Sequence, residues 1–448
     1  MPEARAVKAV DTENTSLLRD EADILAALSE AGFTVYLRGC SAIDSWLGRD
    51  AGAELRVLTG ASLADLARFF ENLRYPGIDI ADAALDYASG SGSCYFDCAD
   101  SEKACNTDRP FPIENHQPSF KLLEFYQDWK TRRFYDPCGI YPLLRQIRKS
   151  RSPTPQLTPR SKDSLSENSP LVVLRDGLNP RVERSRALID GALILAKYFP
   201  DVESLLSQEG SPSVEDGHIE QMARLFRSLP EGPAPGEEEQ RLLLTGLLTA
   251  PNPGLGLELL KSCGFIGEFW PELAVLDDVD QSKEFHPEGN AWKHTLETFR
   301  YRKTGLRGAW DLRLSLGLLL HDVGKPLSAS TGSRRFNGHA ELGERQARRF
   351  LERLGFGASL ISDVCYLVKN HMLPAALPRL PLIRTGEIMA SPLFPTLLEL
   401  YRCDESSSFK GLDGYYESSA AYQSYLKNRR NPYRSADGKK LNRPFTAG

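Results

Sequence analysis

The sequence predicts an α+β protein, with a small α/β domain at the N-terminus followed by a long all-α region. Up to about residue 148, short apolar runs typical of strands alternate with helical patterns. Beyond residue 170, apolar residues recur almost throughout at the 3.6-residue spacing of helices. A chain of 448 residues is too long for one ordinary core, so we expect several domains.

In the N-terminal domain, residues 17–31 have apolar positions at helical spacing, and Gly32 ends that pattern. Strands are expected at 33–39, 53–59 and 93–99, with a helix at 62–73. This alternation is typical of a small α/β domain.

The remaining domains follow from changes in composition. Residues 149–170 are rich in Ser, Pro, Thr and charge and have no apolar period, which predicts a linker. Helical patterns then cover 183–199, 218–229, 237–250 and 256–265. The predicted organisation is an N-terminal domain at 1–148, the linker, a helical neck at 171–283, a second helical domain at 284–426 and a basic tail at 427–448. For the tail, a solvated segment and an RNA contact are both open.

The composition excludes some classes of protein. Hydrophobic residues make up 41% and charged residues 26%, which is ordinary for a globular protein. The net charge of −5 gives no overall attraction to nucleic acid or to an anionic membrane. No apolar run approaches the ~18 residues of a membrane span, and the N-terminus lacks the apolar core of a signal peptide. We therefore expect a cytoplasmic protein without a membrane partner.

The eight cysteines do not suggest a disulfide framework in a chain of this length. Without an export signal they are expected to be reduced and to have no disulfide partner. Cys94, Cys98 and Cys105 cluster, but their spacing matches no zinc pattern.

Metal-binding side chains interrupt several apolar helices of the second helical domain. In "LLLHDVGKP", an apolar run ends at His321 and Asp322, and four more such residues meet an apolar helix or its end: His294, His339, His371 and Asp404. Any one of them could be a helix cap or a satisfied core residue. Burying several together is costly unless a cation or hydrogen bonds compensate. Imidazole and carboxylate together are a usual ligand set for zinc, manganese, iron or nickel.

This pattern resembles the HD superfamily of metal-dependent phosphohydrolases. The superfamily order H…HD…D and the two further histidines of its binuclear members are all filled, in sequence, by His294, His321, Asp322, His339, His371 and Asp404. The resemblance implies a divalent transition metal, as two ions of Mn, Ni, Fe or Zn, with Mg as an alternative.

The resemblance also implies roles. Asp322 would bridge the two ions, with His294, His321 and Asp404 on one ion and His339 and His371 on the other. Asp322 and Lys325 are then the catalytic candidates, since a metal-activated water would attack phosphorus and Lys325 could stabilise the developing charge. A purely structural role for Lys325 is equally open.

The chain also resembles class II tRNA nucleotidyltransferases and poly(A) polymerases. The segments "HPEGNAWKHTLETF", "LLLHDVGKP", "FNGHAELGERQARRFLERL" and "LELLKSCGFIGEFWPEL" are similar to the C-terminal half of that family. In the N-terminal "LRGCSAIDSWLGRD", Gly39 and Cys40 stand for two family glycines. Ile43 replaces the family arginine, and Asp44 is kept. The N-terminal domain is therefore interpreted as a nucleotidyltransferase-like head.

The chemical positions of this head are degenerate. The family's metal-binding DxD is replaced by Glu54-Leu55-Arg56. An arginine repels a cation and would pair with Glu54, although Asp97 could stand for a third family carboxylate. The segment 118–125, "PSFKLLEF", lacks the Arg, Asp and Asn of the corresponding family motif. The resemblance thus implies a head that has lost nucleotide transfer.

The function expected from the sequence is a metal-dependent HD phosphohydrolase on a tRNA nucleotidyltransferase-like scaffold. Its substrate would be a phosphomonoester or a 2′,3′-cyclic phosphate of a nucleotide or RNA end, with tRNA as one candidate. One alternative is a divergent but active tRNA nucleotidyltransferase that uses Glu54 and Asp97. A second is a non-catalytic RNA-binding scaffold with a structural metal, and a third is a di-iron HD oxygenase.

Overall fold

The computed structural model divides the chain into two compact units. Unit 1 comprises Met1–Pro251 and Leu306–Ala309, and unit 2 comprises Asn252–Gly305 and Trp310–Gly448. The division after Pro251 falls inside the range predicted as the neck. The described residues are 21–49, 54–76, 80–87, 92–98, 119–149, 175–179, 181–199, 214–280, 289–305, 309–329, 336–408, 411–431, 433–435 and 439–440. Cys105, the predicted linker beyond Lys149 and the end of the tail lie outside them.

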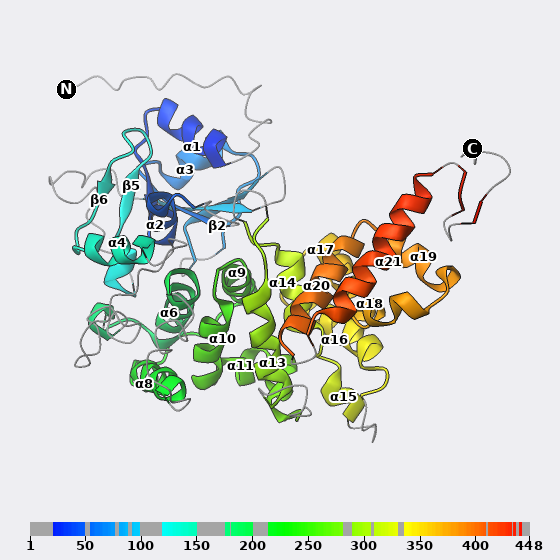
Figure 1. Ribbon diagram of the computed structural model, residues 1–448. Coiled ribbons are helices and arrows are strands. Elements are labelled where there is room, and N and C mark those ends of the chain that lie inside the picture. Colours follow the sequence, from blue (N-terminus) through cyan, green and yellow to red (C-terminus); the bar gives the residue numbers. More distant parts are fainter. Residues whose placement is uncertain are drawn as a thin grey trace, which may run out of the picture. The chain divides into compact units, whose positions relative to one another are not determined.

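Unit 1 is built around a mixed sheet whose strand order is β3-β4-β2-β1-β5-β6 (Figure 1). Strands β2 and β4 are parallel, and the other neighbours are antiparallel. The strands predicted at 33–39, 53–59 and 93–99 are confirmed as β1, β2 and β4. Strands β3, β5 and β6 are short and were not predicted. The six strands are β1 Val35–Arg38, β2 Glu54–Thr59, β3 Ala83–Asp86, β4 Ser93–Cys98, β5 Tyr126–Asp128 and β6 Phe134–Tyr135.

The helices of unit 1 include elements of both the predicted head and the predicted neck. Their apolar sides are buried, as Ile24 and Leu28 of the first helix illustrate. The helices are α1 Glu21–Glu30, α2 Cys40–Leu47, α3 Leu63–Phe69, α4 Tyr141–Lys149, α6 Arg184–Tyr198, α8 Val214–Arg227 and α9 Glu237–Leu248. Together with the sheet, they confirm the predicted α+β fold class.

Unit 2 is helical throughout its described residues, apart from isolated β-bridges such as Asp280 with Asn290. Helix α14 packs against α17 and α20, and α20 packs against α21 (Figure 1). Its helices are α10 Pro253–Ser262, α11 Phe265–Phe269, α12 Pro271–Ala274, α13 Ala291–Thr298, α14 Leu312–Leu320, α15 Lys325–Ala329, α16 His339–Arg353, α17 Ala358–Asn370, α18 Leu373–Ala376, α19 Leu382–Ala390, α20 Phe394–Ser406 and α21 Asp413–Arg429. This confirms the predicted all-α character of the C-terminal half.

Polar caps and a close helix contact fix the ends of the helices that reach the centre of unit 2. The Asn290 side chain accepts a hydrogen bond from the Lys293 N–H and so starts α13. Asp311 caps α14 in the same way through the Arg313 N–H. In α14, a Cβ at Gly317 would lie 2.9 Å from Leu400, so this glycine allows α14 to approach α20 closely.

Gly324, in the turn before α15, is required for a backbone contact with α16. A Cβ there would overlap the His339 carbonyl oxygen and lie 2.5 Å from the Gly343 nitrogen. Because both atoms belong to the backbone, neither can rotate away. Gly324→Ala should lower the free energy of unfolding by about 1–3 kcal/mol, as overpacking does, measured by denaturant titration. The control is Gly267→Ala in α11, where a Cβ meets no atom within 4 Å. An equal loss of unfolding free energy in Gly324→Ala and Gly267→Ala would contradict the requirement for glycine at position 324.

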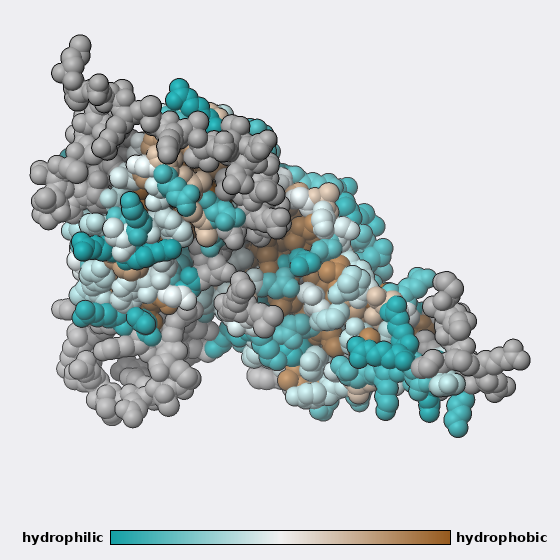
Figure 2. Space-filling model, turned by 90° about the horizontal axis from the view of Figure 1, so that it is seen from above, coloured by the Kyte–Doolittle hydropathy of each residue, from teal (hydrophilic) through white to brown (hydrophobic). Residues whose placement is uncertain are grey.

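The surface combines hydrophilic and hydrophobic side chains. On the face seen in Figure 2, teal hydrophilic residues cover much of the area that is not grey, and brown hydrophobic areas are interspersed among them. No helix among the described residues combines the length and apolar character that crossing a membrane requires. The seven cysteines of the described part of the chain are free thiols.

Candidate functional site

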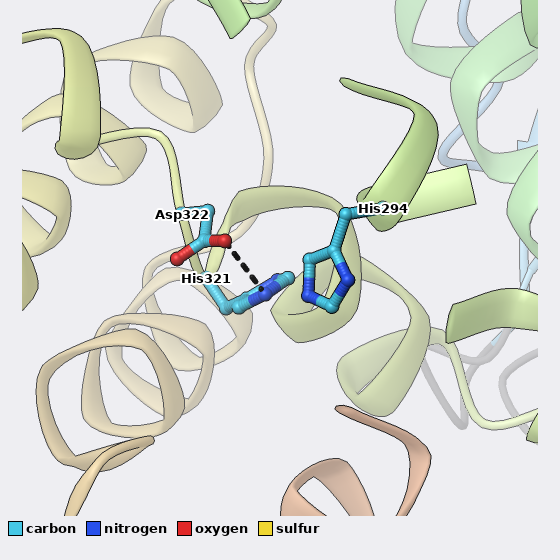
Figure 3. A group of neighbouring side chains, drawn as sticks. All are labelled: His294, His321 and Asp322. Atoms are coloured by element: carbon cyan, nitrogen blue, oxygen red, sulfur yellow. Dashed lines mark ion pairs between the residues drawn. The ribbon is translucent and has the colours of Figure 1, made fainter. Parts of the chain in front are cut away.

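The six side chains that the sequence singles out as metal ligands come together in unit 2. Five of them are buried, and the side chain of Asp404 is 24% exposed. Figure 3 shows His294, His321 and Asp322 pointing toward one another. The elements that position the six are helix α13 for His294, the turn after α14 for His321 and Asp322, the start of α16 for His339, the end of α17 for His371 and the last turn of α20 for Asp404.

Asp322 is shared between two groups of potential ligands. Its Oδ2 lies 3.2 Å from His321 Nε2, and its Oδ1 lies 3.7 Å from His339 Nε2. In each of two groups, His294–His321–Asp322 and Asp322–His339–His371, one ligand atom per residue lies within 4.8 Å of the others. This arrangement allows Asp322 to bridge two ions.

Asp404 joins the first group. Its Oδ1 lies 3.0 Å from His294 Nε2 and 4.0 Å from His321 Nε2. The structure therefore brings all six predicted residues together in the predicted grouping, while their role as ligands stays a prediction.

Backbone carbonyls orient three of the four imidazoles. A carbonyl oxygen only accepts, so each contacting Nδ1 carries a proton, and in a neutral imidazole this leaves the lone pair on Nε2. The Nδ1–oxygen distances are 2.7 Å for His321 with Leu318, 2.8 Å for His339 with Phe336 and 2.7 Å for His371 with Val368. The Nε2 atoms that face the centre are thus in the form that binds a metal ion.

At the centre of the cluster, lone pairs of histidine nitrogens face one another and repel. A bound cation would remove this repulsion. The Nε2 atoms of His339 and His371 lie 3.0 Å apart. His321 Nε2 is buried and has no hydrogen-bond partner in the described part of the chain. These nitrogen and carboxylate donors fit a divalent transition ion better than Mg²⁺, which prefers oxygen ligands. When bound, such an ion would act as a Lewis acid.

The protonation states also suit metal binding. Burial, reinforced by the nearby His321, lowers the pKa of His371 to about 4. Burial likewise lowers the pKa of His339. Burial alone would raise the pKa of Asp322, but His321 and Lys325 hold it well below its usual range. At neutral pH these two histidines are therefore neutral and the aspartate is charged.

The stability of the metal-free protein should depend on pH through His371. Its folded pKa of about 4 lies below the ordinary value of 6.5, so between these pH values only the unfolded chain binds the proton. The free energy of unfolding should therefore fall as pH falls through this window, by about 3 kcal/mol. Denaturant titrations with chelator at several pH values measure it.

The matched variant is His371→Gln, which keeps a polar side chain that does not titrate. In this variant the free energy of unfolding should depend less steeply on pH, by up to about 1.4 kcal/mol per pH unit, which is the slope that one proton contributes. An unchanged slope would contradict the low pKa of His371.

Lys325, the other catalytic candidate, forms an ion pair with Asp322. Its ammonium lies 2.6 Å from Asp322 Oδ2, and its side chain is 13% exposed. It also lies 5.7 Å from the centre of the Phe336 ring. A lysine so placed balances the charge of the carboxylate, and its catalytic role stays a prediction.

In the head, each candidate carboxylate is paired with an arginine. Arg56 Nε donates to Glu54, its Nη1 donates to the Ile80 carbonyl, and its guanidinium lies 4.8 Å from the centre of the Tyr95 ring. Burial opposes the charge of Arg56, but Glu54 and Asp97 raise its pKa. As they stand, these residues do not fit a pair of divalent cations, because a fixed positive charge already neutralises Glu54.

Asp97 is paired with Arg38, which the sequence analysis did not single out. Arg38 Nη1 donates to Asp97 Oδ2 across 59 residues of sequence. Arg38 directly precedes Gly39 and is on the predicted strand, so its presence near the motif was visible. Its partner depends on the order of strands in the sheet, which the sequence did not reveal.

Asp44, the acid kept from the family motif, serves the scaffold. It is buried and ties α2 to α6 by accepting from Lys197 Nζ at 3.0 Å and from the Tyr198 hydroxyl at 3.1 Å. Burial opposes the charge of Lys197, but Asp44 raises its pKa. Arg49 Nη1 also lies 3.7 Å from Asp44 Oδ1. This network gives Asp44 a structural role within unit 1.

Comparison with known proteins gives two kinds of match. Residues 292–392 match the HD domain family. The chain is 33% identical to the CC-adding tRNA nucleotidyltransferase of Thermus thermophilus over 215 residues, 46% of this chain and 47% of that protein. It is 32% identical to the A-adding tRNA nucleotidyltransferase of Deinococcus radiodurans over 184 residues, 39% of this chain and 41% of that protein. The chain thus spans less than half the length of these relatives.

Among solved structures, the chain is similar to the Bacillus stearothermophilus CCA-adding enzyme in complex with CTP. The alignment has a TM-score of 0.39 and 13% identity and covers 91% of this chain and 82% of that chain.

These relatives correct the function expected from the sequence. The prediction of an HD phosphohydrolase as the main activity is wrong, because both named relatives add nucleotides to tRNA. The ligand cluster indicates a metal, but a ligand set does not by itself identify a reaction. Over less than half of its length the chain is similar to tRNA nucleotidyltransferases, and its residues 292–392 match the HD domain family.

Proposed function

We propose that the chain acts on the 3′ end of tRNA as a divergent tRNA nucleotidyltransferase. The observation that carries the proposal is its similarity to proteins named for adding C or A residues to tRNA. The mixed sheet supports it, since Glu54 of β2 and Asp97 of β4 lie on neighbouring parallel strands. Work on tRNA would also agree with a cytoplasmic location.

The reaction proposed is a nucleotidyl transfer. The 3′-hydroxyl oxygen of the tRNA forms a bond to the α-phosphorus of a nucleoside triphosphate. The bond from that phosphorus to the β-phosphate bridging oxygen breaks, and pyrophosphate leaves. The proton of the hydroxyl is released to a base. Because Glu54 and Asp97 each pair with an arginine, we expect this addition to be slow.

The test is extension of tRNA transcripts that end before the CCA sequence, after its first C or after its second C. Each is incubated with CTP or ATP alone and resolved on a sequencing gel. Glu54→Ala and Asp97→Ala should each slow addition by about 100-fold or more, because the transfer would need these two carboxylates, released from their arginines, to hold a divalent cation. Asp65→Ala, at the exposed cap of α3, is the control and should retain the wild-type rate. Addition that survives both head substitutions would contradict the proposal.

A second candidate function is tRNA binding without nucleotide addition. The specific observation that favours it is the pairing of both head carboxylates with Arg38 and Arg56. This candidate predicts tRNA binding in a filter or gel-shift assay with no extension of any transcript. The same transcripts therefore separate the two functions.

For unit 2 we propose a structural or regulatory metal centre with two transition ions. The six candidate ligands would hold these ions: His294, His321, Asp322, His339, His371 and Asp404. The two groups of ligand atoms that share Asp322 support two ions rather than one. Elemental analysis of the purified protein gives the identity and the number of the ions.

A further inference from the structure

The C-terminal end of α21 and the turn that follows it form a basic surface on unit 2. Residues 418–448 contain seven basic residues and one acid, Asp437, whereas the whole chain has a net charge of −5. In Figure 1, this end of α21 extends past α18 and α20, which pack against the helix. The described basic side chains of this surface are all exposed: Lys427, Arg429, Arg430, Arg434, Lys439 and Lys440.

Backbone contacts gather these side chains at one place. The Arg434 N–H donates to the Asn431 carbonyl at 3.1 Å, which forms a turn directly after the helix. The Ser435 N–H then donates to the Lys439 carbonyl at 2.9 Å, and Arg434 forms an antiparallel bridge with Lys440. The two lysines therefore lie beside the turn that carries Arg434, rather than farther along an extended chain.

Gathering like charges costs free energy unless an anion compensates. Lys427 and Arg430 are three residues apart in α21, and the bridge sets Arg434 opposite Lys440. Within the described part of the chain, four of the cations form no ion pair with an acid: Lys427, Arg429, Arg430 and Lys440. The negative end of the helix dipole attracts cations, but this attraction falls off within the last turn. It therefore does not explain the cations that lie beyond the helix.

We infer that this basic surface binds the phosphate backbone of an RNA. Its arginines offer planar guanidiniums that bind phosphate oxygens in pairs and can also stack on bases. Tyr433 follows α21 and is 60% exposed, so its ring is available to stack on a base as well. A helix that binds a membrane surface presents an exposed apolar face together with its charge. Among the described residues after Glu417, Tyr433 is the one large apolar side chain that is exposed, and this favours RNA over a membrane.

The experiment measures the affinity of the full chain for a tRNA transcript by filter binding at several salt concentrations. The choice of tRNA as the RNA rests on the proposed function. Because each phosphate contact releases counterions, Arg429→Ala/Arg430→Ala should reduce the slope of log affinity against log salt by about 2. Arg429→Lys/Arg430→Lys, which keeps both charges, should retain most of the slope. The control Arg348→Ala/Arg349→Ala removes the same charge from α16, where Arg348 pairs with Glu344 at 4.0 Å, and should keep the wild-type slope.

Three results would overturn the inference. They are a wild-type slope in Arg429→Ala/Arg430→Ala, an equal reduction in the α16 control, and a wild-type protein that binds no tRNA, whether or not it binds phosphatidylserine vesicles. Circular dichroism shows whether each variant is folded. If Arg429→Ala/Arg430→Ala does not fold, Lys440→Ala decides, because Lys440 lies outside α21. Its slope should fall by about 1, and an unchanged slope would overturn the inference. Nucleotide addition is not measured, so a failure of the proposed transfer leaves these results readable.

Discussion

Replacing Asp322 by alanine should remove metal from both halves of the centre at once. Asp322 is the one residue common to both groups of ligand atoms in the described structure, so its loss leaves each group with only imidazoles and, in one, Asp404. It would also leave the Lys325 ammonium, 2.6 Å away, without its counter-charge beside the site. Elemental analysis after gel filtration should show the metal content falling from that of wild type to near zero.

Two comparisons make this result specific. Asp363→Ala removes an acid of α17 that pairs with Arg313 at 3.3 Å, outside the centre, and should leave the metal content unchanged. His371→Ala removes a member of one group only and should lower the content by no more than one ion per chain. Wild-type metal content in Asp322→Ala would rule out a bridging role for this carboxylate.

Replacing Asp44 by alanine should destabilise unit 1 by about 3–5 kcal/mol, the cost of removing one partner of a buried ion pair. Asp44 and Lys197 are both largely sequestered from water, with side chains 5% and 19% exposed. Removal of the carboxylate leaves the ammonium without its charge partner and leaves the Tyr198 hydroxyl with the Cys40 carbonyl, 3.3 Å away, in place of the closer Asp44 carboxylate. Denaturant unfolding followed by circular dichroism measures the loss.

A double substitution separates the ion pair from general damage. In Asp44→Ala/Lys197→Met the ammonium that pairs with Asp44 is removed as well, so part of the lost stability should return, while Arg49, 3.7 Å from Asp44, still loses its partner. Glu220→Ala removes an exposed partner of Arg227 and should lower the free energy of unfolding much less than Asp44→Ala does, because water screens an exposed ion pair. A loss in Asp44→Ala as small as that in Glu220→Ala would contradict the role assigned to the buried network.

Much of the candidate metal centre could be predicted from the sequence. Each ligand marks the end or the polar face of an apolar helix, as His321 and Asp322 do after α14. Signals of this kind are local and can therefore be recognised in the amino-acid sequence. The fold class was predictable for the same reason, because alternation and helical periodicity are local properties.

The head could not be predicted in the same detail. The pairing of Arg38 with Asp97 depends on which strands are neighbours, and the strand order is not a local property. Likewise, Lys197 pairs with Asp44 across 153 residues of sequence. The sequence motif around Asp44 therefore could not indicate its structural role. The main activity was misjudged because the ligand set was taken to identify the reaction.

The proposal for tRNA is tested most directly by single-turnover nucleotide addition to a tRNA transcript that lacks its 3′ CCA, with labelled CTP and ATP supplied separately. The expected result is addition of at least one labelled nucleotide by the wild-type protein, lost on Glu54→Ala. No addition to any transcript by folded protein that binds the same tRNA would contradict the proposed nucleotidyl transfer and would favour the role in tRNA binding alone.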